Sequence, residues 1–102
     1  MNCKAISIPG GWNIADMQPV NLPQKAASAF SGALENLVGA SYEPVLYCGQ
    51  QVVNGVNYGV ICKQTIPAPG GAYEHLVFVS LHEKEREGEP AEYSIAAITP
   101  II

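Results

Sequence analysis

Hydrophobic and polar positions divide the chain into three parts that follow different periods. Residues 1–21 are rich in proline and glycine and keep no sustained period, which predicts an extended arm with a short strand near 12–16. Apolar residues then recur at helical spacing over 22–39, and from 42–102 they recur with a period of two. The pattern predicts one domain over 1–102, made of an arm, a helix and a set of strands.

The helix predicted over 22–39 has a narrow apolar face that is rich in alanine. Pro23 suits the first helical turn, and Gly39 suits the position just beyond the last one. Because the side chains of this face are small, the helix should lie close against a sheet. Gly32 inside the helix costs about 1 kcal/mol relative to alanine, which packing has to offset. The apolar face consists of Ala26, Phe30, Ala33, Leu34 and Leu37.

Four later segments alternate and are rich in Val, Ile and Tyr, which is typical of β-strands. The breaks between them are Asn54-Gly55, the glycine- and proline-rich run 67–71, and the charged run 82–90, which we interpret as a solvated loop. Short connections favour an antiparallel meander. The expected fold class is therefore α+β, with one long helix on a twisted four- to five-stranded antiparallel sheet. The strand segments are 44–53, 56–66, 73–82 and 91–99.

The run QVVNGVNY at 51–58 is the most informative short stretch. Asn54-Gly55 is a strong hairpin signal, because both residues tolerate positive φ. The hairpin places Val52 and Val53 near its tip, where water reaches them unless they pack on the body of the fold or a partner covers them. Taken alone, the motif favours an ordinary hairpin whose valines pack inward.

Composition excludes several classes of function. Hydrophobic residues make up 48% of the 102, and 5 basic residues stand against 9 acidic ones, for a net charge of -4. Such a balance argues against nucleic acid, whose binding depends on Lys and Arg at the phosphates. No stretch approaches the roughly 20 apolar residues that span a bilayer. The start, MNCKAISIPGG, lacks a signal-peptide pattern, so we expect a cytoplasmic protein.

The chain offers no recognisable catalytic or metal-binding pattern. The carboxylates form no pair that is typical of acid–base catalysis, and neither histidine has a nucleophile at a spacing typical of a catalytic pair. The sequence also lacks a glycine-rich phosphate-binding loop. The three cysteines show no CxxC and no Cys/His spacing, which argues against zinc. We therefore expect a protein that is not an enzyme, with no cofactor, no metal and no catalytic residue. His75 is interpreted as an ordinary sheet residue.

Three cysteines and the single tryptophan leave alternatives open. Cys48 and Cys62 flank the Asn-Gly turn almost symmetrically, so they either face each other across two strands or, as we favour, are two small buried hydrophobes. Cys3 on the arm is the more reactive thiol and could link two chains. Trp12 fits a binding hot spot and an anchor of the arm in the core equally well.

At this point the chain resembles the cystatin family, and most of all its intracellular stefin branch. QVVNG at 51–55 matches the family's Gln-Val-Val-x-Gly hairpin and is followed by VNY, where stefins also have Asn-Tyr. IPGG at 8–11 is similar to the stefin opening, and YEHLVFVSL at 73–81 resembles the family's His-Leu-x-Val-Phe strand. The resemblance covers nearly the whole chain. It implies a long helix wrapped by a twisted antiparallel sheet.

The resemblance also implies a function, reversible inhibition of papain-like, cathepsin-type cysteine peptidases. In the family, the arm and two hairpins form one wedge that plugs the active-site groove. The second hairpin departs from the family because 82–90 is longer and heavily charged, and Asn54 replaces a small residue. Carried over to this chain, the peptidase-binding residues are Gly10, Gly11, Gln51, Val52, Val53, Asn54, Gly55 and His82.

A second hypothesis is a non-inhibitory interaction or self-association module. In cystatin folds, opening of the first hairpin lets two chains exchange the arm, helix and first strand. The expected state is therefore a monomer, or a dimer formed by domain swapping or through Cys3.

Overall fold

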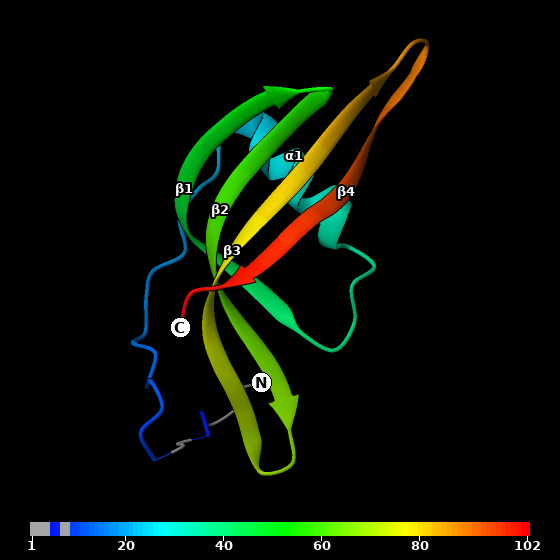
Figure 1. Ribbon diagram of the computed structural model, residues 1–102. Coiled ribbons are helices and arrows are strands. Elements are labelled where there is room, and N and C mark those ends of the chain that lie inside the picture. The colour runs from blue at the N-terminus through cyan, green and yellow to red at the C-terminus, as the bar shows by residue number, and fades with distance from the viewer. Residues whose placement is uncertain (1–4, 7–8) are drawn as a thin grey trace.

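The computed structural model describes residues 5–6 and 9–102 (Figure 1). The α+β class is confirmed, with one helix packed on a four-stranded antiparallel sheet. The strand order is β1-β2-β3-β4, which is the predicted meander. The elements are α1 (Gln24–Leu34), β1 (Ser41–Val53), β2 (Gly55–Ala68), β3 (Gly71–Arg86) and β4 (Glu89–Pro100).

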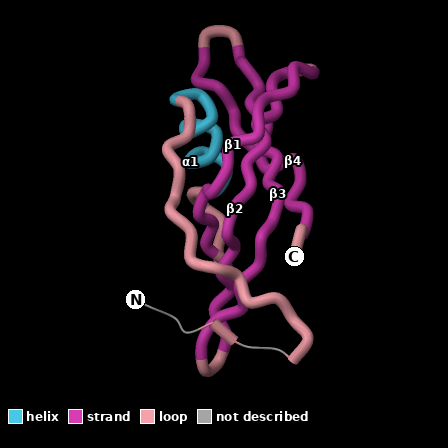
Figure 2. Tube along the Cα trace, turned by 90° about the vertical axis from the view of Figure 1, so that its left-hand side faces the viewer, coloured by secondary structure: helices cyan, strands magenta, loops and turns pink. Residues whose placement is uncertain are grey.

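The helix covers one face of the sheet and leaves the other, which we call the open face, without a helix (Figures 1 and 2). It lies against β3 and β4, and the expected close packing has a direct cause at Gly32. A Cβ at Gly32 would lie 2.5 Å from Cδ2 of Tyr93, so only glycine lets the helix approach β4 so closely. The buried core consists of Ala26, Ala29, Tyr58, Val60, Cys62, Val77, Val79 and Leu81.

The helix is shorter than the prediction of 22–39. It ends at Leu34, and the N–H of Leu37 closes a turn onto the carbonyl of Leu34 at 3.1 Å. Leu37 and Val38 are exposed, so a further helical turn would gain no burial to stabilise it. Gly39 has a positive φ of 89°, but it lies in the connection to β1 and does not end the helix.

The charged run 82–90 is not the expected loop. β3 continues to Arg86, β4 begins at Glu89, and only a turn at Glu87-Gly88 separates them. β3 and β4 remain hydrogen-bonded as far as the pair Arg86 and Glu89. The side chains of these two residues also form an ion pair across the turn at 2.6 Å, which helps to stabilise the hairpin. The other breaks lie where they were predicted, at Asn54 and at Pro69-Gly70.

The arm contains no strand over 12–16, contrary to the expectation. It descends from the helix along the β1 side of the molecule and passes to the open face (Figures 1 and 2). The N–H of Val20 donates to the carbonyl of Pro44 at 2.9 Å, and Asp16 bonds to Lys63 at 3.4 Å. Farther out, the N–H of Ile6 donates to the carbonyl of Ala72 at 2.7 Å. The described residues add only an isolated parallel bridge at Ala5 to the four strands.

Candidate functional site

The tip of the β1–β2 hairpin exposes two valines. Asn54 alone separates the strands, and Val53 pairs directly with Gly55. Val52 is 76% exposed and Val53 44% exposed. The valines therefore do not pack inward, and the interpretation of the motif as an ordinary hairpin with buried valines is wrong.

Gly55 makes this turn possible in a way that the sequence signal only partly describes. Its φ is +105°, whereas no residue other than glycine, Asn54 included, has a positive φ in the described chain. Asn54 tolerates positive φ, which is why it contributes to the hairpin signal, but it does not adopt it here. A Cβ at Gly55 would lie 2.8 Å from Cε1 of His82 and would collide with the carbonyl of Glu83. The turn packs directly on β3.

A row of hydrogen bonds ties the first hairpin to the second on the open face. Asn57 donates through Nδ2 to Oε1 of Gln51 at 3.2 Å, and its Oδ1 lies 2.8 Å from Nδ1 of His82. Since the amide nitrogen is used on Gln51, Oδ1 accepts and Nδ1 of His82 carries the donated proton. His82, expected at the binding surface, is half-buried beside Gly55 and supports the hairpin from beneath.

On the helix face, the buried carboxylate of Glu83 in β3 links the second hairpin to β2 of the first. Glu83 is only 8% exposed, and the hydroxyl of Tyr58 donates to its Oε1 at 3.1 Å. Burial and then this carboxylate raise the pKa of Tyr58 to about 12. Burial first, and the Glu83 charge second, also raise the pKa of Tyr93.

The sequence interpretation missed Glu83 by placing it in a solvated loop. A signal was present, because Glu83 continues the period of two that puts Val77, Val79 and Leu81 on the core face.

The outer part of the β3–β4 hairpin carries most of the net charge of the protein. Residues 83–92 hold five glutamates against one lysine and one arginine, a net -3 of the chain's -4. Arg86 bonds to Glu89 at 2.6 Å and to Glu92 at 3.7 Å. A groove of about 340 Å³ separates this hairpin from the valine-bearing tip. The groove is lined by Asn54, Gly55, Val56, Glu83, Lys84 and Glu85.

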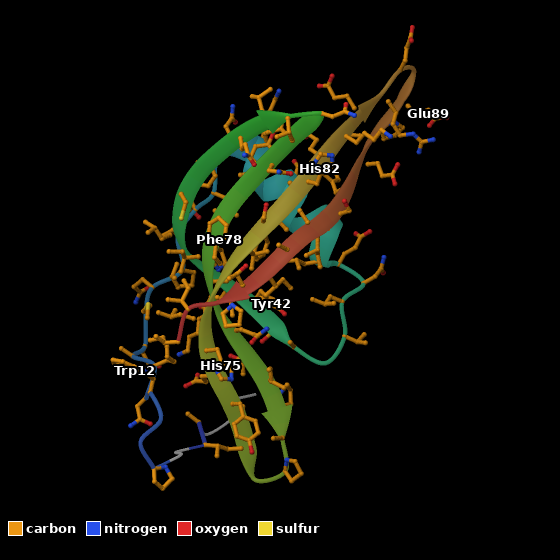
Figure 3. The ribbon with its side chains drawn as sticks, viewed as in Figure 1. Trp12, Tyr42, His75, Phe78, His82 and Glu89 are labelled. Carbon is orange, nitrogen blue, oxygen red and sulfur yellow. The ribbon has the colours of Figure 1, made fainter. Side chains whose placement is uncertain are left out.

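We call this part of the molecule, with the tips of both hairpins and the groove between them, the hairpin end. The arm residues expected to join it lie at the other end. Gly11 and Trp12 line a cavity of about 160 Å³ together with Tyr73 and His75, next to the β2–β3 hairpin, and we call this the arm end. Figure 3 shows His82 and Glu89 at one end of the sheet and Trp12 and His75 at the other.

The structure therefore brings Gln51, Val52, Val53, Asn54, Gly55 and His82 together but leaves Gly10 and Gly11 apart from them. Trp12 is largely exposed, so it does not anchor the arm in the core. His75 lies in β3, as expected.

The two cysteines in the described residues have different surroundings. Cys62 faces the helix and is fully buried, and burial raises its pKa to about 12. Cys48 lies at a register break of β1, is exposed, and lines a cavity of about 280 Å³ on the open face beside Phe78 (Figure 3). Both thiols are free. The favoured expectation of two buried cysteines is thus correct for Cys62 alone, and the alternative of a pair is wrong. Cys3 lies outside the described residues.

Within residues 5–6 and 9–102, no group of three or more His, Cys, Asp or Glu side chains is arranged to hold a metal ion. None of the helices in the same residues is long and apolar enough to cross a membrane. Comparison with known proteins finds no matching family model, no matching curated protein and no matching solved structure. The resemblance to cystatins therefore depends on the short motifs alone.

Proposed function

We propose that this protein is a reversible inhibitor of papain-like, cathepsin-type cysteine peptidases that binds through its hairpin end. The observation that carries the proposal is the exposure of Val52 and Val53 on a turn that is already fixed. When a partner's groove covers two apolar side chains that were exposed to water, their burial stabilises the complex. The stabilisation is about 1.5–3 kcal/mol for each side chain that becomes fully buried.

The contacts beneath the tip support this function because they lower the ordering cost of binding. Gly55 packs on His82 and Glu83, and Asn57 ties Gln51 to His82. The hairpin therefore needs no rearrangement to present its valines. Inhibition by occlusion requires no catalytic group from the inhibitor.

The position of the arm changes how this inhibitor would work. Gly10 and Gly11 lie at the arm end, so the edge that meets the peptidase consists of two hairpins, without the third component that cystatins use. We therefore expect weaker inhibition than a wedge of three parts would give. The acidic second hairpin favours peptidases with a basic rim and makes association dependent on salt.

Titration of papain and a cathepsin L-type enzyme, in reducing buffer, tests the proposal. The informative variant is Val52→Asp, because Val52 is exposed and its replacement should leave the fold intact. Loss of its burial, together with the cost of burying a charge, should raise the inhibition constant about 100-fold. The matched control is Val38→Asp, in the exposed connection after α1, which should inhibit like the wild type.

Substitution of Gly55 is less suitable, since any Cβ there disturbs the packing on β3 as well as the surface. A folded wild type that leaves both peptidases active at high micromolar concentration would refute inhibition. The alternative function, a non-inhibitory module that exchanges its arm, α1 and β1 between two chains, would then be favoured. The single-residue connection at Asn54 supports that alternative, because opening it joins β1 and β2 into one long strand.

A further inference from the structure

The outer edge of β4 is a free sheet edge, and over residues 93–99 its protection against pairing is one bulge, at Ala96. β4 is the last strand of the sheet, and in the described residues no backbone hydrogen bond joins its outer side to another segment. Residues 93–102, YSIAAITPII, contain no charged side chain. Exposed edges generally carry charges or are covered, because their free N–H and C=O groups otherwise pair with another strand.

The opposite edge is different. The outer side of β1 is partly occupied where the N–H of Val20 donates to the carbonyl of Pro44. Two register breaks also distort β1, one just after Pro44 and one at Cys48. β4 has two register breaks as well, one near its start between Glu89 and Glu92 and one at Ala96, but no backbone hydrogen bond occupies its outer side in the described residues. Of the two edges, β4 is the one open to a new strand.

The sequence of β4 indicates what that strand is. Ser94 to Thr99 read S-I-A-A-I-T, which is the same chemistry in both directions: a hydroxyl, an isoleucine and an alanine, then alanine, isoleucine and hydroxyl. An antiparallel pairing of β4 with itself, about a two-fold axis between Ala96 and Ala97, would place each residue opposite its chemical equal. Hydroxyl pairs and apolar pairs across neighbouring strands are both stabilising.

The faces of the sheet agree with this register. Ile95 and Ile98 pair with Leu81 and Val79 of the core, so both lie on the helix face. Ser94 and Thr99 pair with His82 and Phe78, so both lie on the open face. Directly opposed residues must share a face, and the bulge at Ala96 shifts the alternation so that they do on both sides of the axis. Without the bulge, the same pairing would place each residue opposite one whose side chain lies on the other face of the sheet.

We infer that the β4 edge is a homodimer interface, at which two copies join antiparallel into one continuous eight-stranded sheet. The two-fold axis makes the contact isologous, so that every pairing occurs twice and the assembly closes as a dimer. The centre of the interface, at Ala96–Ala97, lies beside Ser80 in the middle of β3. The hairpin end of each copy therefore remains free in the dimer. The inference does not depend on the function proposed above.

Light scattering after size-exclusion chromatography tests it, over about 5–500 μM protein in reducing buffer, which removes disulfide-linked dimers. We expect a reversible dimer that becomes a monomer on dilution. Ala97→Lys places two like charges beside the axis and should raise the dissociation constant at least about tenfold. Ala97→Glu should do the same, and mixing the two variants should restore a dimer that contains one of each.

Gln50→Lys is the matched control, because it adds the same charge to an exposed position on the other edge strand. It should dimerise like the wild type. Hydrogen exchange of the wild type provides a test that needs no variant: the amides of 94–99 should be better protected at high concentration than at low. A wild type that stays monomeric at about 500 μM, or a dimer that is indifferent to Ala97→Lys, overturns the inference. A dimer that is unchanged by Ala97→Lys is the result expected if the two copies instead exchange their arm, α1 and β1.

Discussion

At the hairpin end, contacts between residues distant in sequence fix a turn and a charge in place, whereas at the arm end a few bonds hold a long segment against the sheet. Gly55 packs on His82 and Glu83, and the buried Glu83 accepts a hydrogen bond from Tyr58. The arm is held by bonds spread over its length, among them the pair of Asp16 with Lys63. Asp16 itself is fully exposed, and exposed pairs contribute little.

The difference supports the proposal that a partner binds at the hairpin end. A surface that is ordered before binding loses less entropy when a partner arrives. Val52 and Val53 are presented by such a surface, whereas Trp12, also exposed, belongs to a segment that contributes no residue to the buried core. Exposure of an apolar side chain is therefore a stronger indication of binding at the hairpin end than at the arm end.

Among the substitutions, the largest effect on stability at neutral pH is expected from Gly55→Ala. The new Cβ faces both a positive φ, which costs about 1–2 kcal/mol, and a collision with β3, which costs roughly another 1–3 kcal/mol. Gly88→Ala is the matched control, because Gly88 also has a positive φ, of 72°, but open space around its Cβ position. Urea unfolding should show a loss of about 3 kcal/mol for the first and about 1 kcal/mol for the second. Equal losses would show that the turn does not pack on β3.

The next effect is a loss of stability in alkali. Tyr58 and Cys62 have ordinary pKa values of 10.0 and 9.0, and burial raises both to about 12 in the folded protein. A raised pKa in an acid means that the folded state holds the proton more tightly than the unfolded chain. These two groups should therefore not change the free energy of unfolding below pH 9 and should lower it as the pH rises from 9 to about 12.

Urea titrations across this range, on the wild type and on Tyr58→Phe, check the contribution of the hairpin end. The variant loses the bond to Glu83 and is less stable at neutral pH, but its stability should fall less steeply above pH 10. Parallel curves for the two proteins would show that Tyr58 is not protected by burial.

The smallest effect is expected at the arm end, from Asp16→Asn. Burial by itself lowers the pKa of Lys63, but the carboxylates of Glu74 and Asp16 more than offset it and raise that pKa above its ordinary value. Because Glu74 still bonds to Lys63 at 3.1 Å in the variant, the free energy of unfolding should fall by less than about 1 kcal/mol.

Local measurements should respond more than global ones. Hydrogen exchange at the amides of Ile6 and Val20 should accelerate, and the fluorescence of Trp12 should change. Glu35→Gln removes a charge from another exposed carboxylate and is the control, with no change at these amides. A global loss as large as that of Gly55→Ala would show that the arm is an integral part of the fold.

Much of the fold is predictable because its elements depend on local patterns. The period of two over the last sixty residues and the breaks at Asn54 and at 67–71 were sufficient for the meander. The ends of elements were less predictable. The helical period continues to Leu37, but the helix ends at Leu34, since burial and not periodicity decides whether another turn forms. The run 82–90 looks like a loop by composition, and cross-strand pairing makes it a hairpin.

The candidate site divides in the same way. The residues of the turn were enough to predict the first hairpin, the position of Val52 and Val53 near its tip, and the need for glycine at Gly55, because a turn is specified by the few residues that form it. Three-dimensional packing exposes Val52 and Val53, buries Glu83 beneath both hairpins, and places Gly10 and Gly11 at the far end of the sheet. Those outcomes depend on contacts between segments that are far apart in the chain. The energy of such contacts depends on both segments at once, so no short stretch of sequence is sufficient to predict it.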